Sequence, residues 1–345
     1  MVDRAFPGWF YPSTRQHCVF RRSYKSWTRQ ITRQKASGDP SGNARAILRM
    51  ANPDYRSSVL GHPFPFFSPP LLPILNLQRM DHTMAEHFAA ENGRRLIQPF
   101  LEPLQRARGI QCDQLGAFEI GTKKYSLPRF TFGGPNSTDP IRIGIFAAIH
   151  GDEPAGALAA AKFLLDLATA PEIAENFLLQ VYPICNPTGF EDNTRCSRRG
   201  RDLNREFWRA SVEPEIEILE HELRTSHFNG IIQLHADDTS QGLYGFVRGH
   251  TLTENLLRPA LTEAGKILPR NIDAIIDGFA ARDGIIYEQY EGILAAPARI
   301  DPAPFEIILE TPHHAPMEQQ VEALVVAMRT ILNEYRRLIS FAANI

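Results

Sequence analysis

Signals for membrane insertion and secretion are what this sequence most plainly lacks. Its apolar stretches, such as residues 71–75, are short and interrupted by proline, whereas a membrane-spanning helix needs about 20 mostly apolar residues. No N-terminal apolar segment precedes a small-residue cleavage site, as a secretory signal would require. We therefore expect a cytoplasmic protein without a membrane partner.

Paired cysteines and a strong overall charge are absent as well. The four cysteines, at positions 18, 112, 185 and 196, form no CxxC pair, so the spacing typical of a thiolate zinc site is missing. The formal net charge of −2 gives no sign of a polyanionic partner, and we expect no nucleic acid among the ligands. The 345 residues are enough for a sizeable hydrophobic core.

The first 80 residues differ in composition from the rest. They contain 12 Lys/Arg against 3 Asp/Glu, and a run of proline and aromatic residues at 63–70. An Arg-rich, acid-poor leader is typical of a transit peptide or of a segment that binds an acidic partner, and a start near Met80 or Met84 would make it upstream sequence. We interpret residues 1–80 as a poorly ordered extension and residues 81–345 as the folded catalytic domain.

From Met84 onward, apolar periodicity predicts alternating strands and helices. A hairpin is expected at 118–132, and residues 269–298 have the composition of loops. Further strands are predicted at 141–149, 177–185, 230–235, 244–247 and 305–310, and helices at 84–107, 154–168, from 214, 253–267 and 317–338. Several strands are apolar on both faces, which favours an α/β single domain with a mixed, mostly parallel sheet between helix layers.

Residues that can bind a metal stand at the ends of three of these strands. His150 and Glu153 follow the first, His235 ends the second and Glu310 ends the third. The carboxyl ends of parallel strands meet at the sheet edge where α/β proteins bind ligands. Two histidines and one carboxylate leave a zinc ion with an open position for water, as hydrolysis requires. The remaining carboxylate is then free to act as a general base.

Each of these residues also has an ordinary explanation. A histidine and a glutamate after a strand often only cap a loop, and Glu310 could simply form an ion pair. Asp237 and Asp238, next to His235, could repel acidic substrates, attract a cationic group or cap a turn. The joint placement at strand ends is what favours a functional site.

The polar loop after residue 185 strengthens this interpretation. It contains NPTG at 186–189, NTR at 193–195 and DLNR at 202–205. With HxxE at 150–153, the strand-end histidine and the strand-end glutamate in this order, the sequence resembles the M14 zinc carboxypeptidase superfamily, which includes the succinylglutamate desuccinylase/aspartoacylase branch. The resemblance runs from roughly Arg142 through Glu310 and implies a zinc carboxypeptidase-like fold.

The resemblance implies a role for each residue of the metal site. His150, Glu153 and His235 would ligate one zinc ion per chain, and Glu310 would assist the attack of zinc-bound water on an amide. Glu310 would take a proton from the water and pass it to the leaving amine. Asp202 would orient a ligand imidazole and thereby fix its tautomer.

The family also uses a basic residue upstream of DLNR to stabilise the oxyanion of the tetrahedral intermediate. Arg195 fits that place because of its NTR context. Arg198 is close enough in the sequence to be an alternative, and the residues alone do not choose between them.

Substrate contacts follow from the same resemblance. Asn204 and Arg205 match the pair that holds the substrate's terminal carboxylate, a task suited to the forked guanidinium group. The tyrosine that closes over substrate in the family has two candidates here, Tyr287 and Tyr290. The sequence does not predict the oligomeric state.

The function implied first is that of a metallocarboxypeptidase, a protease that releases the C-terminal residue of a small peptide. The alternative is a deacylase of N-acyl amino acids; only 35 residues follow Glu310, which leaves no room for the C-terminal β domain of many aspartoacylase-type proteins. A catalytically silent zinc- or peptide-binding module is a third interpretation, which retention of Glu310 beside a complete ligand set argues against.

Overall fold

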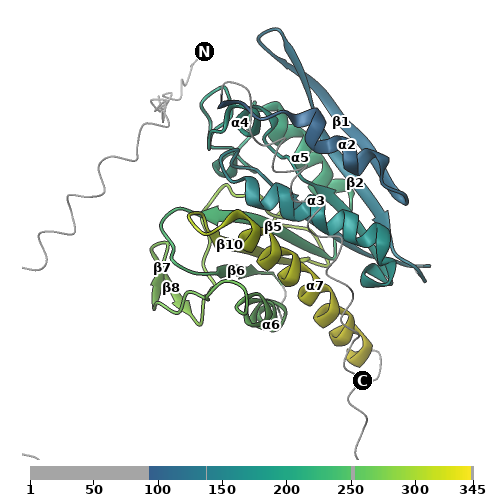
Figure 1. Ribbon diagram of the computed structural model, residues 1–345, viewed down its shortest axis with the longest axis vertical. Coiled ribbons are helices and arrows are strands. Elements are labelled where there is room, and N and C mark those ends of the chain that lie inside the picture. Colours follow the sequence, from purple (N-terminus) through teal and green to yellow (C-terminus); the bar gives the residue numbers. More distant parts are fainter. Residues whose placement is uncertain (1–92, 137, 250–252, 343–345) are drawn as a thin grey trace, which may run out of the picture. The chain divides into compact units, whose positions relative to one another are not determined.

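A ten-stranded mixed sheet organises the part of the chain that the computed structural model describes, residues 93–136, 138–249 and 253–342 (Figure 1). The predicted extension, residues 1–80, lies outside these ranges. The strands are β1 (Ile110–Ile120), β2 (Lys123–Gly133), β3 (Ile141–Ala147), β4 (Phe177–Tyr182), β5 (Gly230–Asp237), β6 (Tyr244–Arg248), β7 (Ile275–Ile276), β8 (Phe279–Arg282), β9 (Ile285–Ile286) and β10 (Phe305–Pro312). The helices are α2 (Ile97–Arg106), α3 (Pro154–Thr169), α4 (Pro187–Asp192), α5 (Pro214–Thr225), α6 (Glu254–Ala264) and α7 (Met317–Ala342), with short 3-10 turns η4 (Pro171–Ala174) and η5 (Leu203–Arg205).

The centre of the sheet is parallel and its flanks are antiparallel. The strand order is β1-β2-β4-β3-β5-β10-β6-β9-β8-β7. Strands β4, β3, β5 and β10 run parallel, while the β1–β2 hairpin and β6 pair antiparallel with this central group. The predicted single α/β domain with a mixed sheet between helix layers is confirmed, and four strands end side by side at one edge of its centre.

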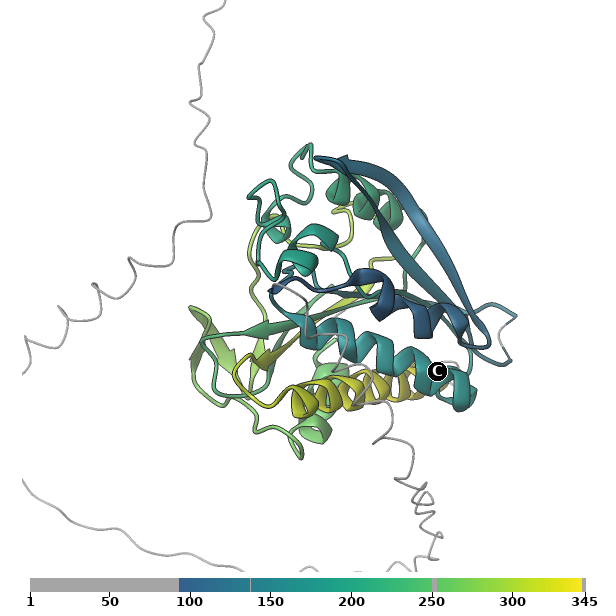
Figure 2. The same cartoon turned by 45° about the horizontal axis from the view of Figure 1, so that its top comes forward.

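Helices cover both faces of the sheet because the central strands are apolar on both sides. Ile143, Ile145 and Ala147 of β3 pack into the larger core with α3, α6 and α7. Phe146 points to the opposite face, where it stacks on Tyr182 with ring centroids 4.4 Å apart in the core that includes α5. Figure 2 shows α3 and α7 side by side beneath the long β1–β2 hairpin.

The connection from β3 to α3 brings His150 to the sheet edge. Ala148 adopts a left-handed conformation (φ 48°), an uncommon backbone state for a residue with a Cβ atom. Gly151 then passes so close to α4 that an added Cβ would lie 1.9 Å from the backbone of Gly189. Only glycine fits at this crossing, and the first residue of the HxxE motif is thereby placed against the NPTG segment.

The three shortest strands fall inside the stretch that composition indicates as loop, residues 269–298. Strands β7, β8 and β9 have only two to four residues each, too few for an alternating pattern to stand out. Asp277 and Gly278, both with positive φ, form the turn between β7 and β8, as an Asp-Gly pair favours. This small hairpin completes the sheet beyond β6.

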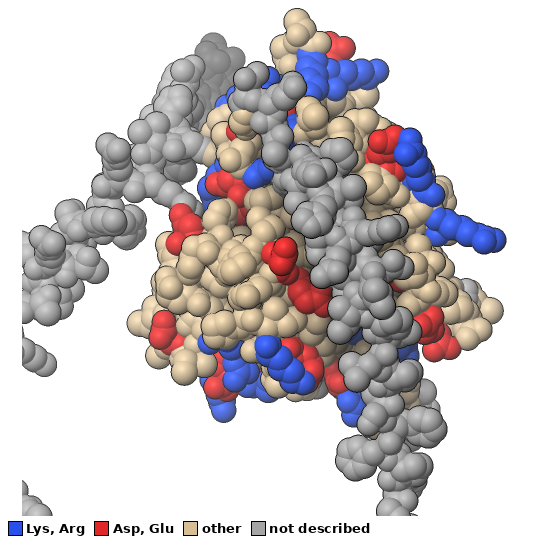
Figure 3. All heavy atoms as spheres, viewed as in Figure 1, with Lys and Arg blue, Asp and Glu red and all other residues tan. Residues whose placement is uncertain are grey.

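The surface and the helices agree with the composition. No helix of the described residues is long and apolar enough to cross a membrane. On the face shown in Figure 3, acidic and basic side chains are interspersed, and neither sign forms an extended patch over the described residues.

Candidate metal centre

Three elements bring the predicted metal ligands together. His150 follows β3, Glu153 stands at the N-cap of α3, and His235 lies near the end of β5. The Glu153 side chain makes no capping hydrogen bond to α3. It points instead between the two histidines.

The donor atoms of these residues converge on one small volume. Glu153 Oε1 lies 2.7 Å from His150 Nδ1, and Glu153 Oε2 lies 3.0 Å from His235 Nδ1. One ligand atom from each residue falls within 4.8 Å of the others, and all three side chains are buried. A buried carboxylate between two imidazoles is a donor set that fits zinc.

Electrostatics support the ionised form of Glu153. Burial alone would raise the pKa of this carboxyl, but the neighbouring His150 and His235 outweigh burial and hold the pKa well below its ordinary value. The backbone N–H of Ala236 also donates to Glu153 Oε2 at 3.2 Å. The carboxylate is therefore available as a ligand without first losing a proton.

Asp202 lies on the far side of the His150 ring. Its Oδ1 is 3.3 Å from His150 Nε2, and burial is outweighed by His150 and Arg195, which lower the pKa of Asp202. With a proton on Nε2 facing Asp202, the Nδ1 lone pair of His150 points toward Glu153 and is free for a metal.

We expect the substitution Asp202→Asn to weaken zinc binding by about 10- to 100-fold, because asparagine does not stabilise the Nε2–H tautomer through a charge. The affinity would be measured by competition with a chromophoric chelator, with Asp192→Asn as the control in the same loop region. An unchanged zinc affinity would show that Asp202 does not orient His150.

Glu310 is placed beside the cluster by strand pairing. It is directly opposite His235 in the parallel β10–β5 register, and its side chain makes no hydrogen bond with another described residue. Burial, together with the charges of Glu153 and Asp237, raises the pKa of Glu310 well above its ordinary value. A carboxylate that must accept and then release a proton benefits from such a shift.

The structure separates the two candidate arginines. Arg195 Nη1 lies 3.2 Å from His150 Nδ1 and 3.5 Å from Glu153 Oε1, and its Nε donates to Asp202 at 3.1 Å. Arg198 instead pairs with Glu191 and Asp192 at 2.9 and 2.6 Å. Only Arg195 is therefore in reach of a group bound at the cluster.

The structure also separates the predicted substrate residues into a group of neighbours and one residue that lies apart from them. The Arg205 guanidinium stacks 4.3 Å above the ring of Tyr290, whereas the hydroxyl of Tyr287 hydrogen-bonds Glu254 at the start of α6. Asn204 Oδ1 accepts the backbone N–H of Leu294 at 2.8 Å and so anchors the segment that carries Tyr290. The structure brings Asn204, Arg205 and Tyr290 together and does not bring Tyr287 to them.

Tyr244 is a residue of the site that sequence reasoning missed. It stands opposite Glu310 in the antiparallel β10–β6 register, and its hydroxyl donates to Asp237 Oδ2 at 2.9 Å. Burial, with the charges of Glu310 and Asp237, raises the pKa of Tyr244. Asp237 also accepts from Thr239 and so caps a turn. Nothing in a five-residue strand marks one tyrosine as facing a site, so only the register could reveal it.

Comparison with known proteins agrees with this geometry. Residues 140–268 match the model of the succinylglutamate desuccinylase/aspartoacylase catalytic domain. No curated protein matches the chain. The structure resembles that of a proposed metallopeptidase from Shewanella amazonensis, with 26% identity, a TM-score of 0.58, and coverage of 69% of this chain and 92% of the other.

The fold is also similar to that of a second solved structure. The metallo-carboxypeptidase from Burkholderia cenocepacia is 16% identical, with a TM-score of 0.55 and coverage of 70% of this chain and 68% of the other. Fold, cluster and family model together define a hydrolytic enzyme with a candidate metal site. Residues 140–268 thus resemble the succinylglutamate desuccinylase/aspartoacylase catalytic domain, and the described fold is similar to that of solved metallopeptidase structures.

Proposed function

We propose that the protein is a zinc-dependent amide hydrolase, most specifically a metallocarboxypeptidase that releases a C-terminal residue. The observation that carries this proposal is the position of Glu310. It is a partly buried carboxylate whose side chain makes no hydrogen bond among the described residues, and the β10–β5 register sets it next to the His-Glu-His cluster.

His150, Glu153 and His235 would hold the zinc ion through the two Nδ1 atoms and the carboxylate between them. When bound there, zinc lowers the pKa of water and polarises a carbonyl group. The donor set fits, since it offers two neutral imidazoles and one anion and leaves a coordination position for a non-protein ligand.

Glu310 would act as the general base and then as the general acid. It would remove a proton from the attacking water and deliver that proton to the departing nitrogen of the amide. Arg195, held in place by Asp202, would donate hydrogen bonds to the oxygen on which negative charge develops.

Arg205, Asn204 and Tyr290 would hold the far end of the substrate. The guanidinium of Arg205 stacks on Tyr290, and its Nη1 donates to the backbone oxygen of Asn204 at 2.7 Å; both contacts limit its motion, and its other N–H groups would bind a carboxylate. A C-terminal carboxylate bound there would set the scissile amide against Glu310 and Arg195. This arrangement supports the carboxypeptidase assignment.

A deacylase of N-acyl amino acids is the second candidate. It is supported by the match of residues 140–268 to the succinylglutamate desuccinylase/aspartoacylase catalytic domain. An N-acyl amino acid also presents an amide next to a free carboxylate, so the same residues could serve both substrates.

The test is metal content together with hydrolysis of a substrate panel. We expect about one zinc per chain and cleavage of either C-terminally varied dipeptides or N-acyl amino acids, but of neither class after blocking the substrate carboxylate as a primary amide. The class that is cleaved distinguishes peptidase from deacylase. A protein that cannot be loaded with zinc, or a zinc-loaded protein that cleaves neither class, would refute the proposal.

A further inference from the structure

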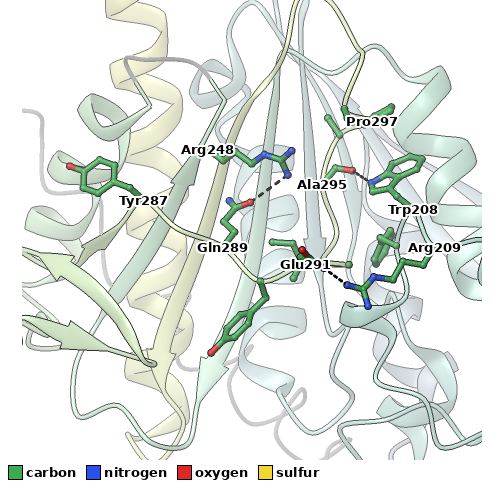
Figure 4. Close-up of a pocket in the computed structure, with 14 residues that line it drawn as sticks. Trp208, Arg209, Arg248, Tyr287, Gln289, Glu291, Ala295 and Pro297 are labelled. Carbon is green, nitrogen blue, oxygen red and sulfur yellow. Dashed lines mark hydrogen bonds and ion pairs between the residues drawn. The ribbon is translucent and has the colours of Figure 1, made fainter. Parts of the chain in front are cut away.

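A cavity lies along the same strands as the candidate metal centre (Figure 4). Its volume is about 590 Å³, within the range of small-molecule sites. Arg248, which lines it, is the β6 partner of Glu306, whereas Tyr244 is the partner of Glu310. Four residues of extended strand, about 13 Å, separate the two pairs, so Arg248 lies well away from the metal cluster, while Tyr290, one of the proposed substrate residues, also lines the cavity.

Hydrogen-bond donors without good acceptors mark one wall of this cavity. Arg248 Nη1 is 3.5 Å from Gln289 Oε1 and 3.7 Å from Glu306 Oε2, both longer than a strong hydrogen bond. Gln289 Nε2 is shielded from solvent and has no partner among the described residues. A buried donor of this kind is costly unless a ligand or water satisfies it.

The opposite wall is flat and mostly apolar. Trp208 faces Arg248 across the cavity in Figure 4, and its indole N–H donates to Ala295 O at 3.0 Å, which fixes the plane of the ring. Pro297 and neighbouring alanines continue this wall. At the rim, Arg209 is already paired with Glu291 at 3.0 Å.

We propose that this cavity binds a carboxylate-bearing small molecule with a flat apolar body. The carboxylate would accept hydrogen bonds from Arg248 and Gln289, since the guanidinium fork matches the geometry of a carboxylate. The apolar body would lie against Trp208. The carboxylates of Glu291 at the rim and Glu306 beneath Arg248 oppose a dianion, so a single negative charge fits better than a phosphate group.

Benzoate is a suitable probe, with benzamide as the uncharged match. The chain has three tryptophans, Trp9, Trp27 and Trp208; in full-length protein carrying Trp9→Phe and Trp27→Phe, fluorescence reports on Trp208 alone. We expect benzoate to change this fluorescence saturably and benzamide to bind at least about tenfold more weakly, because it lacks the charge that pairs with Arg248.

Two variants test the donors directly. Arg248→Gln removes the cation, and Gln289→Glu replaces the unpartnered donor by a repelling oxygen; each should weaken benzoate binding about tenfold or more. Arg258→Gln, on α6, is the control and should bind as the wild type does, and thermal melting verifies that all variants fold. The proposal is overturned if benzoate and benzamide bind equally, or if both cavity variants retain wild-type affinity.

The same probe distinguishes two sources of the ligand. If benzoate raises the KM of the hydrolytic reaction in the wild type but not in Arg248→Gln, the cavity binds part of the substrate. If KM and kcat are unaffected, the cavity binds a separate carboxylate. Only this comparison depends on the proposed hydrolysis, because the fluorescence titration needs neither turnover nor metal.

Discussion

The substitution Glu310→Gln should lower kcat by about 10²- to 10⁴-fold while the protein still binds zinc. Glutamine preserves the size and polarity of the side chain but cannot accept the proton of the attacking water. Glu310 is not among the clustered ligands, so metal content should not change. Steady-state kinetics on the best substrate of the panel, with zinc measured by atomic absorption on the same sample, would check both parts.

Glu215→Gln provides a matched control. Glu215 is likewise a carboxyl whose pKa is raised by burial, in its case to about 7, but it lies on α5 rather than at the metal cluster. We expect full activity from this variant, which separates loss of the base from the general effect of replacing a buried glutamate. If Glu310→Gln kept wild-type kcat with zinc bound, the assignment of the base would be wrong.

Arg195→Gln should have the second-largest effect, a fall in kcat of about 10²- to 10³-fold with a much smaller change in KM. The guanidinium lies 3.5 Å from Glu153 and is bonded to Asp202, so it is already in place before substrate arrives. A donor held in advance stabilises charge that develops only in the transition state. The separation of kcat from KM is the measurement that identifies this role.

Arg198→Gln tests the alternative that the sequence left open. Because Arg198 bonds Glu191 and Asp192 and not the cluster, we expect its loss to lower the melting temperature and to leave kcat of the folded enzyme unchanged. The reverse outcome, with kcat reduced by Arg198→Gln and retained by Arg195→Gln, would move the oxyanion role to Arg198.

Most of the larger elements could be predicted because their patterns are local. The run 141–149 is apolar on both faces and forms β3 at Ile141–Ala147, and the Ala-rich helix expected at 154–168 is α3 at Pro154–Thr169. Burial on both faces of a central strand excludes polar residues almost completely. Strands β7 to β9 escaped prediction since they are short and gain their order from pairing with β6 and one another.

Several roles within the site depended on contacts between distant segments. From the sequence, Tyr287 and Tyr290 are both candidates, and Arg195 is preferred for its NTR context with Arg198 as the alternative. Two side chains three residues apart have different surroundings. Packing, rather than the motif, decides which surroundings each of them has. Tyr290 stacks against Arg205, whereas Tyr287 does not, and Arg198 pairs with Glu191, whereas Arg195 lies 3.5 Å from Glu153.

The sequence by itself determined which residues are candidate metal ligands and which strand ends carry them, because residue type and apolar periodicity are properties of short segments. Only the tertiary structure decided the register of β10 between β5 and β6, which sets Glu310 opposite both His235 and Tyr244. It alone also revealed the cavity beside Arg248. Register and cavities depend on how distant segments pack, and a shift of one residue would turn Glu310 to the other face of the sheet.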